Sequence, residues 1–398
     1  GFEYTSKGLP AATQEEKKEL EKFGGEIIFT PGDIVYSSTK FLNSSPPNLD
    51  LEKLDSIMQN HKISFNDLTN TIKKIKGTSV HIVGDTIVDT YTRTNFIGGQ
   101  TKTPTFSVLY EKEDSFVGGA AIVALHMRAA GAKVKFTTII SNDKNGKFVK
   151  KKLNRNKIQC NFFEEKNRPT TNKNTFMSTT YRLLKVDTLS NAPINDETLS
   201  KIVNQIKNDK STITVFSDFR HGIFNPRSIQ KLLKAIPKKS FKAGDSQVAS
   251  RWGNITEFKN FDLITPNERE ARFSLADQDS TVGKLAGLLY EKTKCQNLIL
   301  KLGPRGIFCN GLKNKKMQPP FSVGIFADNV QDAVGTGDAL LAYSSLSLKV
   351  SGSLIIGAIL GSFAAACACE VEGNLPIKID KIISKIREVE KKINYIHK

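Results

Sequence analysis

From about residue 78 the chain alternates short apolar, β-branched segments with segments of helical period. Strands are predicted at 80–83, 134–140, 212–217, 241–244, 262–265, 298–301 and 306–309, and helices at 119–130, 144–153, 228–235, from 268 onward, 339–348 and 354–370. This alternation predicts an α/β fold with a mostly parallel sheet and helices on both faces. Such sheets bind ligands beyond the carboxyl ends of their strands, so functional residues are expected in the loops that follow the strands.

Two stretches break the alternation. Residues 92–117 and 175–186 are rich in β-forming residues and lack a helical period, which predicts a small β lid outside the main sheet. Residues 46–77 begin with a Pro- and Asn-rich segment and continue with apolar residues at helical spacing, which predicts linker helices. Residues 1–76 carry few large apolar side chains, so we do not expect them to form an enzyme alone.

The chain has 58 Lys and Arg against 40 Asp and Glu, a net charge of +18. This balance fits a nucleic-acid binder or a Lys-rich surface that attracts phosphorylated substrates. We expect the second and no nucleic-acid partner, because the basic runs lack interleaved aromatic residues. The sequence has no apolar stretch of about 18 residues, and its five cysteines show no framework spacing, so we expect a cytoplasmic protein without a membrane partner.

The most informative motif is Asp-Ala-Val-Gly-Thr-Gly-Asp at 332–338, which precedes an apolar helix. The glycines let the backbone N–H groups of Gly335, Thr336 and Gly337 point at an anion, and the helix dipole favours negative charge there. Asp338, just inside the turn, can accept a proton from a substrate hydroxyl while phosphate charge develops at these N–H groups. The alternative is a Gly-rich helix start with Asp as a capping residue.

Three further motifs each have a structural alternative. Asn267 and Glu270 lie three residues apart at a helix start, where they could place oxygen ligands near Mg²⁺ or only cap the helix. Asp85 and Asp89 follow the first strand and could accept hydrogen bonds from sugar hydroxyls or lie in a solvated loop. Gly118 and Gly119 could let a ligand approach the backbone or form a tight turn.

Taken together and in this order, these motifs resemble the ribokinase-like (PfkB) carbohydrate kinases over about residues 78–395. The resemblance implies a kinase domain over residues 78–398 that uses ATP and Mg²⁺ to phosphorylate a hydroxyl of a sugar or sugar phosphate. It implies Asp338 as the catalytic base, with the N–H groups of residues 335–337 as the anion hole. The other implied roles are sugar binding by Asp85, Asp89, Gly118, Gly119 and Lys173, nucleotide binding by Asn267, Lys301, Gly303, Gly306 and Asn374, and Mg²⁺ placement by Glu270.

Within this family the chain is similar to the heptose-7-phosphate kinase branch. The Ser-Asp-Phe run at 217–219 and the Arg-Pro-Thr-Thr run at 168–171 look like its pattern, which implies work in nucleotide-sugar or heptose-type surface polysaccharide precursor synthesis. Bifunctional members of the branch carry a nucleotidyltransferase domain. Residues 1–45 look like the tail of such a domain, without its His-x-Gly-His motif. The resemblance is also compatible with a homodimer that forms through the β lid.

The chain departs from the pattern of this branch at several positions, two of which bear on the site. Ile122 stands where Asn is usual, so we expect a sugar that lacks one hydroxyl or turns that edge away. The pattern Asp-Pro-Lys is replaced by Asp245-Ser246-Gln247, which removes one positive charge near the phosphates. Two alternative functions of the chain stay open. It could be a non-catalytic sugar- or nucleotide-binding relative, or one half of a bifunctional kinase/nucleotidyltransferase.

Overall fold

The computed structural model describes residues 15, 18–23, 49–99, 105–247, 254–313 and 316–396. The chain divides into two units, Gly1–Glu52 and Lys53–Lys398. In the first unit residues 18–21 are helical. Most of the predicted nucleotidyltransferase tail at 1–45 lies outside the described residues, so it stays a prediction.

The predicted linker helices correspond to α3 (Leu49–Asn60) and α4 (Phe65–Lys74). Ser64 caps α4: its hydroxyl accepts a hydrogen bond from Asp67 N, and the Asp67 carboxylate accepts one from Ser64 N at 2.8 Å. The apolar side of α4 is buried and packs on α11 (Thr336–Ser351) and α13 (Ile379–Ile396). Helix α4 is therefore part of the helical layer of the larger unit.

A ten-stranded sheet runs through the larger unit in the order β13-β12-β11-β10-β9-β8-β1-β4-β5, with β14 paired to β12. The parallel strands are β1 (Ser79–Gly84), β4 (Lys133–Ile139), β5 (Gln159–Phe163), β8 (Ile213–Asp218), β9 (Phe241–Ser246), β10 (Leu263–Ile264) and β11 (Asn297–Lys301). The antiparallel ones are β12 (Ile307–Lys313), β13 (Lys316–Met317) and β14 (Phe321–Val323). The mostly parallel sheet predicted from the sequence is confirmed.

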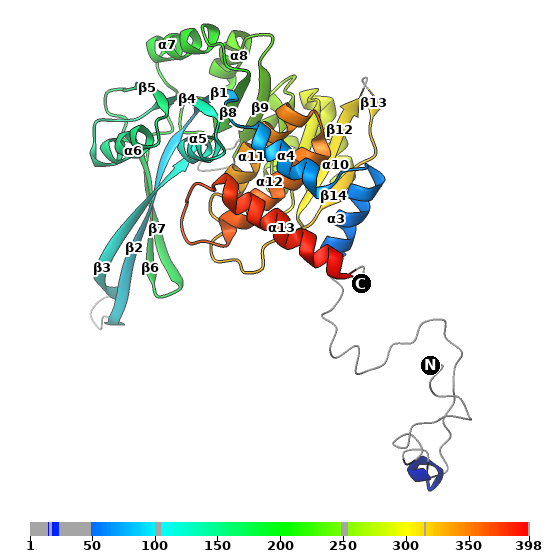
Figure 1. Ribbon diagram of the computed structural model, residues 1–398. Helices are drawn as coiled ribbons and strands as arrows, with labels where there is room; N and C mark the ends of the chain where they lie inside the picture. The colour runs from blue at the N-terminus through cyan, green and yellow to red at the C-terminus, as the bar shows by residue number, and fades with distance from the viewer. Residues whose placement is uncertain are drawn as a thin grey trace. The chain divides into compact units, whose positions relative to one another are not determined.

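Helices cover both faces of this sheet (Figure 1). One layer holds α4, α5 (Ala120–Ala129), α11, α12 (Leu354–Cys369) and α13, and the other holds α7 (Asp196–Lys207), α8 (Pro226–Ala235), α9 (Glu268–Leu275) and α10 (Val282–Thr293), while α6 (Lys144–Arg155) packs near β5. In the second layer Phe216 packs against Phe224, Phe258 and Phe261. No described helix is long and apolar enough to span a membrane.

A separate four-stranded sheet has the order β3-β2-β6-β7 and extends away from the helical layers in Figure 1. Its strands are β2 (Thr86–Gly99), β3 (Phe106–Gly119), β6 (Thr171–Ser178) and β7 (Tyr181–Thr188). The two segments predicted as a β lid fall in this sheet, apart from residues 100–104, which are outside the described residues. The strands are longer than predicted. Thr86 of β2 pairs with Gly119 of β3, so the four-stranded sheet begins next to the carboxyl end of β1.

Candidate functional site

The carboxyl ends of the parallel strands and one face of the four-stranded sheet enclose a cavity of about 890 Å³. This volume lies in the range of small-molecule sites, about 300–1,000 Å³. Neither Asp85 nor Gly118 lines the cavity. The predicted site residues that do line it are Asp89, Gly119, Lys173, Asn267, Glu270, Lys301, Gly303, Gly306, Gly335, Thr336, Gly337, Asp338 and Asn374.

The turn at 332–338 forms the start of α11. Gly335 has a φ of 80°, and a Cβ added there would lie 2.0 Å from Asn374 Oδ1, so a larger residue would not fit. No side chain caps this helix start, and the first N–H groups of a helix lack intrahelical acceptors. Thr336 N donates to Ala333 O at 3.4 Å within the turn, and residues 335–337 line the cavity, so an anion held there would lie next to the start of α11.

Asp338 lies in the first turn of α11 and is 5% exposed. Its Oδ1 has no hydrogen-bond partner. Burial raises the pKa of this carboxyl well above its usual value, and Asp245 raises it further. Lys301 opposes this rise, while Asp89 and Glu270 add to it. The cavity therefore contains a carboxyl oxygen that is suited to a hydrogen bond from a bound hydroxyl.

Lys301 ends β11 beside this turn. Its Nζ donates to Asp245 Oδ2 at 2.8 Å, and a Cβ added at Gly337 would lie 3.2 Å from the same Nζ. Burial lowers the pKa of Lys301, but Asp245 and Glu270 outweigh burial and hold the pKa above its usual value. The ammonium group is therefore charged at neutral pH and lies next to the glycine turn.

Asn267 and Glu270 form a reciprocal cap at the start of α9. Glu270 N donates to Asn267 Oδ1 at 2.8 Å, and Asn267 N donates to Glu270 Oε2 at 2.7 Å. Both residues also line the cavity, so capping does not exclude a role toward a ligand. Within the described ranges no group of three or more His, Cys, Asp or Glu could hold a metal alone. A Mg²⁺ ion here would complete its shell with water and phosphate oxygens, as Mg²⁺ commonly does.

Asp89 on β2, which also lines the cavity, is in register with Lys173 on β6. The Asp89 Oδ2 atom lies 2.1 Å from where a Cβ of Gly118 would be, so residue 118 must be small. Burial raises the pKa of Asp89, and Lys173 and Asn374 oppose this rise. Burial also lowers the pKa of Lys173. A carboxyl and an amine thus lie side by side on the two central strands of the four-stranded sheet.

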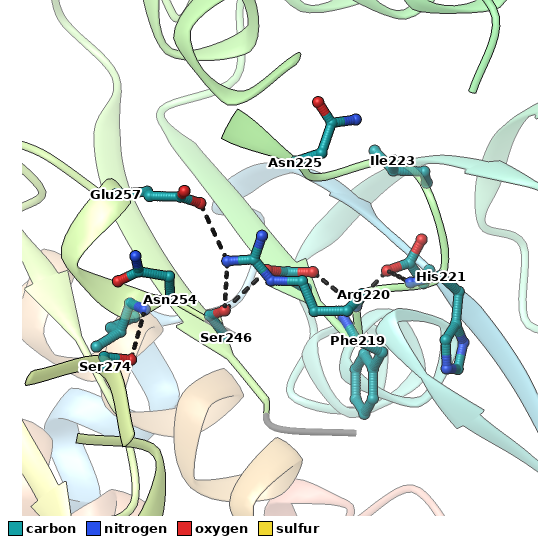
Figure 2. Close-up of polar contacts among 12 residues, drawn as sticks. Phe219, Arg220, His221, Ile223, Asn225, Ser246, Asn254, Glu257 and Ser274 are labelled. Carbon is teal, nitrogen blue, oxygen red and sulfur yellow. Dashed lines mark hydrogen bonds and ion pairs between the residues drawn. The ribbon is translucent and has the colours of Figure 1, made fainter. Parts of the chain in front are cut away.

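Asp85 has a different environment from the one that the sequence suggested. It is buried, and its Oδ2 accepts hydrogen bonds from Phe219 N at 3.0 Å and His221 N at 3.2 Å. In this loop after β8, the Phe219 and His221 rings point to the same side, and Arg220 reaches Glu257 at 3.1 Å (Figure 2). Phe219 lines the cavity, so Asp85 positions part of the cavity wall. Direct sugar binding by Asp85 stays a prediction.

The structure also brings together residues that the sequence analysis did not connect. Tyr91 on β2 donates through its hydroxyl to Asp332 Oδ2 at 2.8 Å, and Arg182 on β7 lies 3.4 Å from Asp332 Oδ1. These contacts link the four-stranded sheet to the first residue of the glycine turn. Tyr91 and Asp332 are 241 residues apart, so no local pattern could have revealed the contact. Ile122 is completely buried in α5 and does not line the cavity, so it is a packed helix residue.

Comparison with known proteins adds independent information. The family model described as pfkB family carbohydrate kinase matches residues 78–378. The bifunctional protein HldE of Campylobacter jejuni strain RM1221 is 28% identical over 322 residues, which cover 78% of this chain and 66% of that protein. HldE of Desulfatibacillum aliphaticivorans is 26% identical, with 78% of this chain and 63% of that protein covered. The chain thus spans less than two thirds of the length of these relatives.

Solved structures show the same fold. Phosphofructokinase-2 from Escherichia coli, in complex with substrates and products, has a TM-score of 0.65 at 17% identity, covering 79% of this chain and 99% of that chain. Arabidopsis thaliana ribokinase, complexed with ribose and ATP, has a TM-score of 0.62 at 16% identity, with 78% and 99% covered. The fold is therefore ribokinase-like. Since the family model matches more than half of its residues, the chain belongs to the pfkB family of carbohydrate kinases.

Proposed function

We propose that this protein transfers the γ-phosphoryl group of ATP to a hydroxyl of a phosphorylated sugar, with Asp338 as the catalytic base. The observation that carries the proposal is the position of the Asp338 carboxyl group. It is buried at a glycine turn, it faces the cavity, and its Oδ1 has no hydrogen-bond partner. A buried acceptor of this kind is uncommon unless a ligand supplies the missing hydrogen bond.

Each part of the site has one task in this proposal. Asp338 accepts the proton of the sugar hydroxyl as its oxygen attacks, and the N–H groups of residues 335–337 donate to the phosphoryl oxygens. Phosphoryl transfer depends mostly on positioning and charge stabilisation, which these groups supply. Mg²⁺ would neutralise phosphate charge, and Glu270 and Asn267 are the residues that would hold it through water. Asn374, Gly303 and Gly306 line the part of the cavity that we assign to the nucleotide.

The charges of the four-stranded sheet support a phosphorylated sugar. Lys173, Lys185 and Arg182 line the cavity together with Asp89. Asp89 can accept hydrogen bonds from sugar hydroxyls, whereas cationic side chains suit a phosphate group. The similarity to HldE proteins makes a heptose phosphate, in nucleotide-sugar or surface polysaccharide precursor synthesis, the first substrate to examine.

The test is to measure ADP formation from ATP with a panel of free and phosphorylated sugars that includes heptose 7-phosphate. We expect ADP formation that depends on a sugar phosphate. Lys173→Met should raise the KM for that sugar phosphate about tenfold or more, as expected for loss of one charged hydrogen bond, and should leave the KM for ATP unchanged. ATP binding without turnover on any sugar would favour the non-catalytic alternative.

We also propose that a second copy of the chain covers the outer face of the four-stranded sheet. Phe96, Tyr110 and Val186 are exposed on the face opposite to Asp89 and Lys173, because side chains alternate along each strand. Exposed apolar surface of this kind marks interaction sites. Phosphofructokinase-2 of the same fold is named as tetrameric in one solved form, which shows that assembly occurs among structural neighbours.

Light scattering after size exclusion tests the assembly. The wild type should be a dimer, and Tyr110→Asp combined with Val186→Asp should be a monomer. Tyr395→Asp, a matched change at an exposed aromatic residue on α13, should stay dimeric. A wild type that is monomeric at all protein concentrations would contradict the proposal.

A further inference from the structure

Arg220 adopts an unusual backbone conformation in the loop that follows β8. Its φ is 59°, in the left-handed region, which is disfavoured for residues that carry a Cβ. Such a conformation persists only where the surrounding contacts determine it, and it is common at functional sites. The contacts around Arg220 therefore have to hold the loop at 219–222 against its local preference.

The Arg220 side chain is buried among polar groups from neighbouring segments (Figure 2). Its Nε lies 2.9 Å from Asp218 Oδ2, and a terminal nitrogen donates to Glu257 Oε2 at 3.1 Å and to Ser246 Oγ at 3.4 Å. Ser246 Oγ donates to Asp218 Oδ2 at 2.8 Å, and Arg220 N donates to Asp218 Oδ1 at 2.7 Å. One side chain thus joins the carboxyl ends of β8 and β9 to the short 3-10 helix Ile255–Glu257.

Asp85 holds the residues on both sides of this left-handed residue. Its Oδ2 accepts hydrogen bonds from Phe219 N at 3.0 Å and His221 N at 3.2 Å, so two N–H groups of the loop share one acceptor. Gly222 follows with a φ of 115°, and a Cβ added there would lie 2.5 Å from Ala192 O. The backbone of the loop is therefore fixed from its first residue to its last.

Within the loop at 219–222, all of which the structure describes, Phe219 alone lines the cavity. Ile87 and Gly119 line it as well, and a Cβ added at Gly119 would lie 2.5 Å from Asp85 O and 3.1 Å from Ile87 Cγ1. Phe219 is bound to the same Asp85 through its N–H group. An aromatic residue and an aliphatic residue therefore lie around Asp85 at one corner of the cavity.

This corner, formed by Phe219, Ile87 and Gly119, adjoins the proposed sugar site. Ile87, Asp89 and Tyr91 alternate along β2 and all line the cavity, as expected for side chains on one face of a strand. Asp89 can accept hydrogen bonds from sugar hydroxyls, whereas the Phe219 and Ile87 side chains offer no hydrogen-bonding group. A hydroxyl held against them would lose its water partners without gaining new ones, which is costly. The corner therefore fits the C–H bonds of a sugar.

We propose that Phe219 is a specificity-determining residue for the sugar phosphate, and that Arg220 and Asp85 are positioning residues that hold it in place. The inference rests on the proposed function. The Phe219 ring contacts an edge of the sugar that carries no hydroxyl or turns its hydroxyl away, next to the hydroxyls that Asp89 binds. Arg220 and Asp85 fix the loop before the substrate arrives, so binding does not have to order it.

The first experiment tests Phe219 by calorimetry without turnover, with heptose 7-phosphate, fructose 6-phosphate and glucose 6-phosphate as probes. Phe219→Ala should weaken binding of the tightest probe about tenfold or more, as expected for loss of an aromatic contact, and should leave ATP affinity unchanged. Phe273→Ala, at an exposed phenylalanine on α9 that does not line the cavity, is the matched control. Unchanged affinity for the tightest probe in Phe219→Ala, or no binding of any probe to the wild type, would overturn the inference.

The same titrations test specificity. Phe219→Ala admits water at the apolar corner, so the ratio of affinities between the tightest and the weakest probe should fall by about threefold or more. A constant ratio would overturn the specificity role, because Phe219 would then add affinity to every probe alike. Failure of the proposed function would look different, since these binding changes would occur while no probe is phosphorylated.

A pair of variants tests Arg220. Arg220→Gly and Arg220→Ala both remove the guanidinium group, but glycine adopts left-handed backbone readily. Affinity for the tightest probe should therefore fall about tenfold in Arg220→Ala and only a few-fold in Arg220→Gly, with ATP affinity unchanged in both. If Arg220→Ala does not fold because Asp218 is left unpaired, both variants are compared in the background of Asp218→Asn. Equal affinities in the two variants would overturn the positioning role of Arg220.

A second pair separates positioning by Asp85 from direct sugar binding. Asp85→Asn keeps an oxygen that can accept from Phe219 N and His221 N, so affinity for the tightest probe should fall by about threefold or less. Asp85→Ala leaves both N–H groups without an acceptor and should lower it about tenfold or more. Hydrogen exchange at these two amides should also be faster in Asp85→Ala than in Asp85→Asn. Equal losses of affinity would mean that the carboxylate charge itself binds the sugar, which would overturn the positioning role of Asp85.

Discussion

Buried charges at the two ends of the parallel strands have different surroundings. At the amino ends, Asp209 lies 3.3 Å from Lys135 Nζ, accepts from Ser211 N at 2.9 Å, and is 3.6 Å from His81 Nδ1. Burial alone would raise the pKa of Asp209, but His81, Ser211 and Lys135 together outweigh burial and hold it below its usual value. This carboxylate is therefore paired within the fold.

At the carboxyl ends, Asp338 and Asp245 each keep a buried oxygen that has no hydrogen-bond partner. Burial is the largest reason why the pKa of each is raised. A buried polar atom without a partner lowers stability. We infer that Asp209 at the amino edge stabilises the fold, whereas Asp338, which lines the cavity at the carboxyl edge, keeps an oxygen whose partner arrives with the substrate.

The largest expected effect is at the carboxyl edge. Asp338→Asn preserves size but cannot take a proton, so turnover should fall by about 10²–10⁴. The same change removes a buried negative charge, so the midpoint temperature of unfolding should rise. Steady-state kinetics and calorimetry on the same sample check both results. Near-normal turnover would contradict the assignment of the base.

The opposite result is expected at the amino edge. Asp209→Ala leaves Lys135 and His81 without their partner, so the free energy of unfolding should fall by about 1–3 kcal/mol. Turnover of the folded fraction should not change, because Asp209 is at the other end of the strands. Urea unfolding measures the first quantity, with the exposed Glu197→Ala as a control. A stability equal to that of the wild type would remove the contrast between the edges.

The pH dependence of stability should reflect titratable groups at both edges of the sheet. Burial lowers the pKa of His81 to about 4 from its usual 6.5, so the unfolded chain binds this proton more readily and stability falls as the pH drops from 6.5 towards 4. Asp338 acts in the opposite direction. Its pKa is raised in the folded state, so its contribution to stability is greatest below pH 3.8 and falls as the pH rises.

Unfolding midpoints across this pH range should therefore be less acid-sensitive in His81→Gln than in the wild type. Burial also lowers the pKa of His126, to about 3. This histidine therefore also makes stability fall with falling pH, and part of the acid sensitivity should remain in His81→Gln. Identical acid profiles for the two proteins would show that His81 does not carry the effect.

The smallest expected effect concerns Asp332, a carboxylate at the carboxyl edge that has partners in Tyr91 and Arg182. Tyr91→Phe removes the hydrogen bond to Asp332, which is worth about 0.5–1.5 kcal/mol. We expect a fall of a few-fold in kcat/KM, because the four-stranded sheet would hold the glycine turn less firmly. An effect as large as that of Asp338→Asn would mean that Tyr91 touches the substrate.

The sequence predicted the parts of the site that depend on local patterns. The turn before α11 was visible because glycine is favoured where φ is positive, as at Gly335, and the cap formed by Asn267 and Glu270 follows from their spacing of three residues. The sequence analysis did not predict β5, which is short and carries polar residues, or the helices α7, α10 and α13. The hydrogen bonds of Asp85 could not be predicted from the sequence either, because its partners lie 134 and 136 residues away.

Much of the alternation of strands and helices, the mostly parallel sheet and the glycine turn before α11 could be inferred from the amino-acid sequence, because periodicity and glycine conformation are properties of neighbouring residues. The tertiary structure alone decided which carboxyl groups are paired and which are left open. It also decided that Lys301, 56 residues from Asp245 in the chain, is held beside the glycine turn. Burial and charge interactions depend on the atoms that surround a group in space, and at this site those atoms come from segments that are far apart in the sequence.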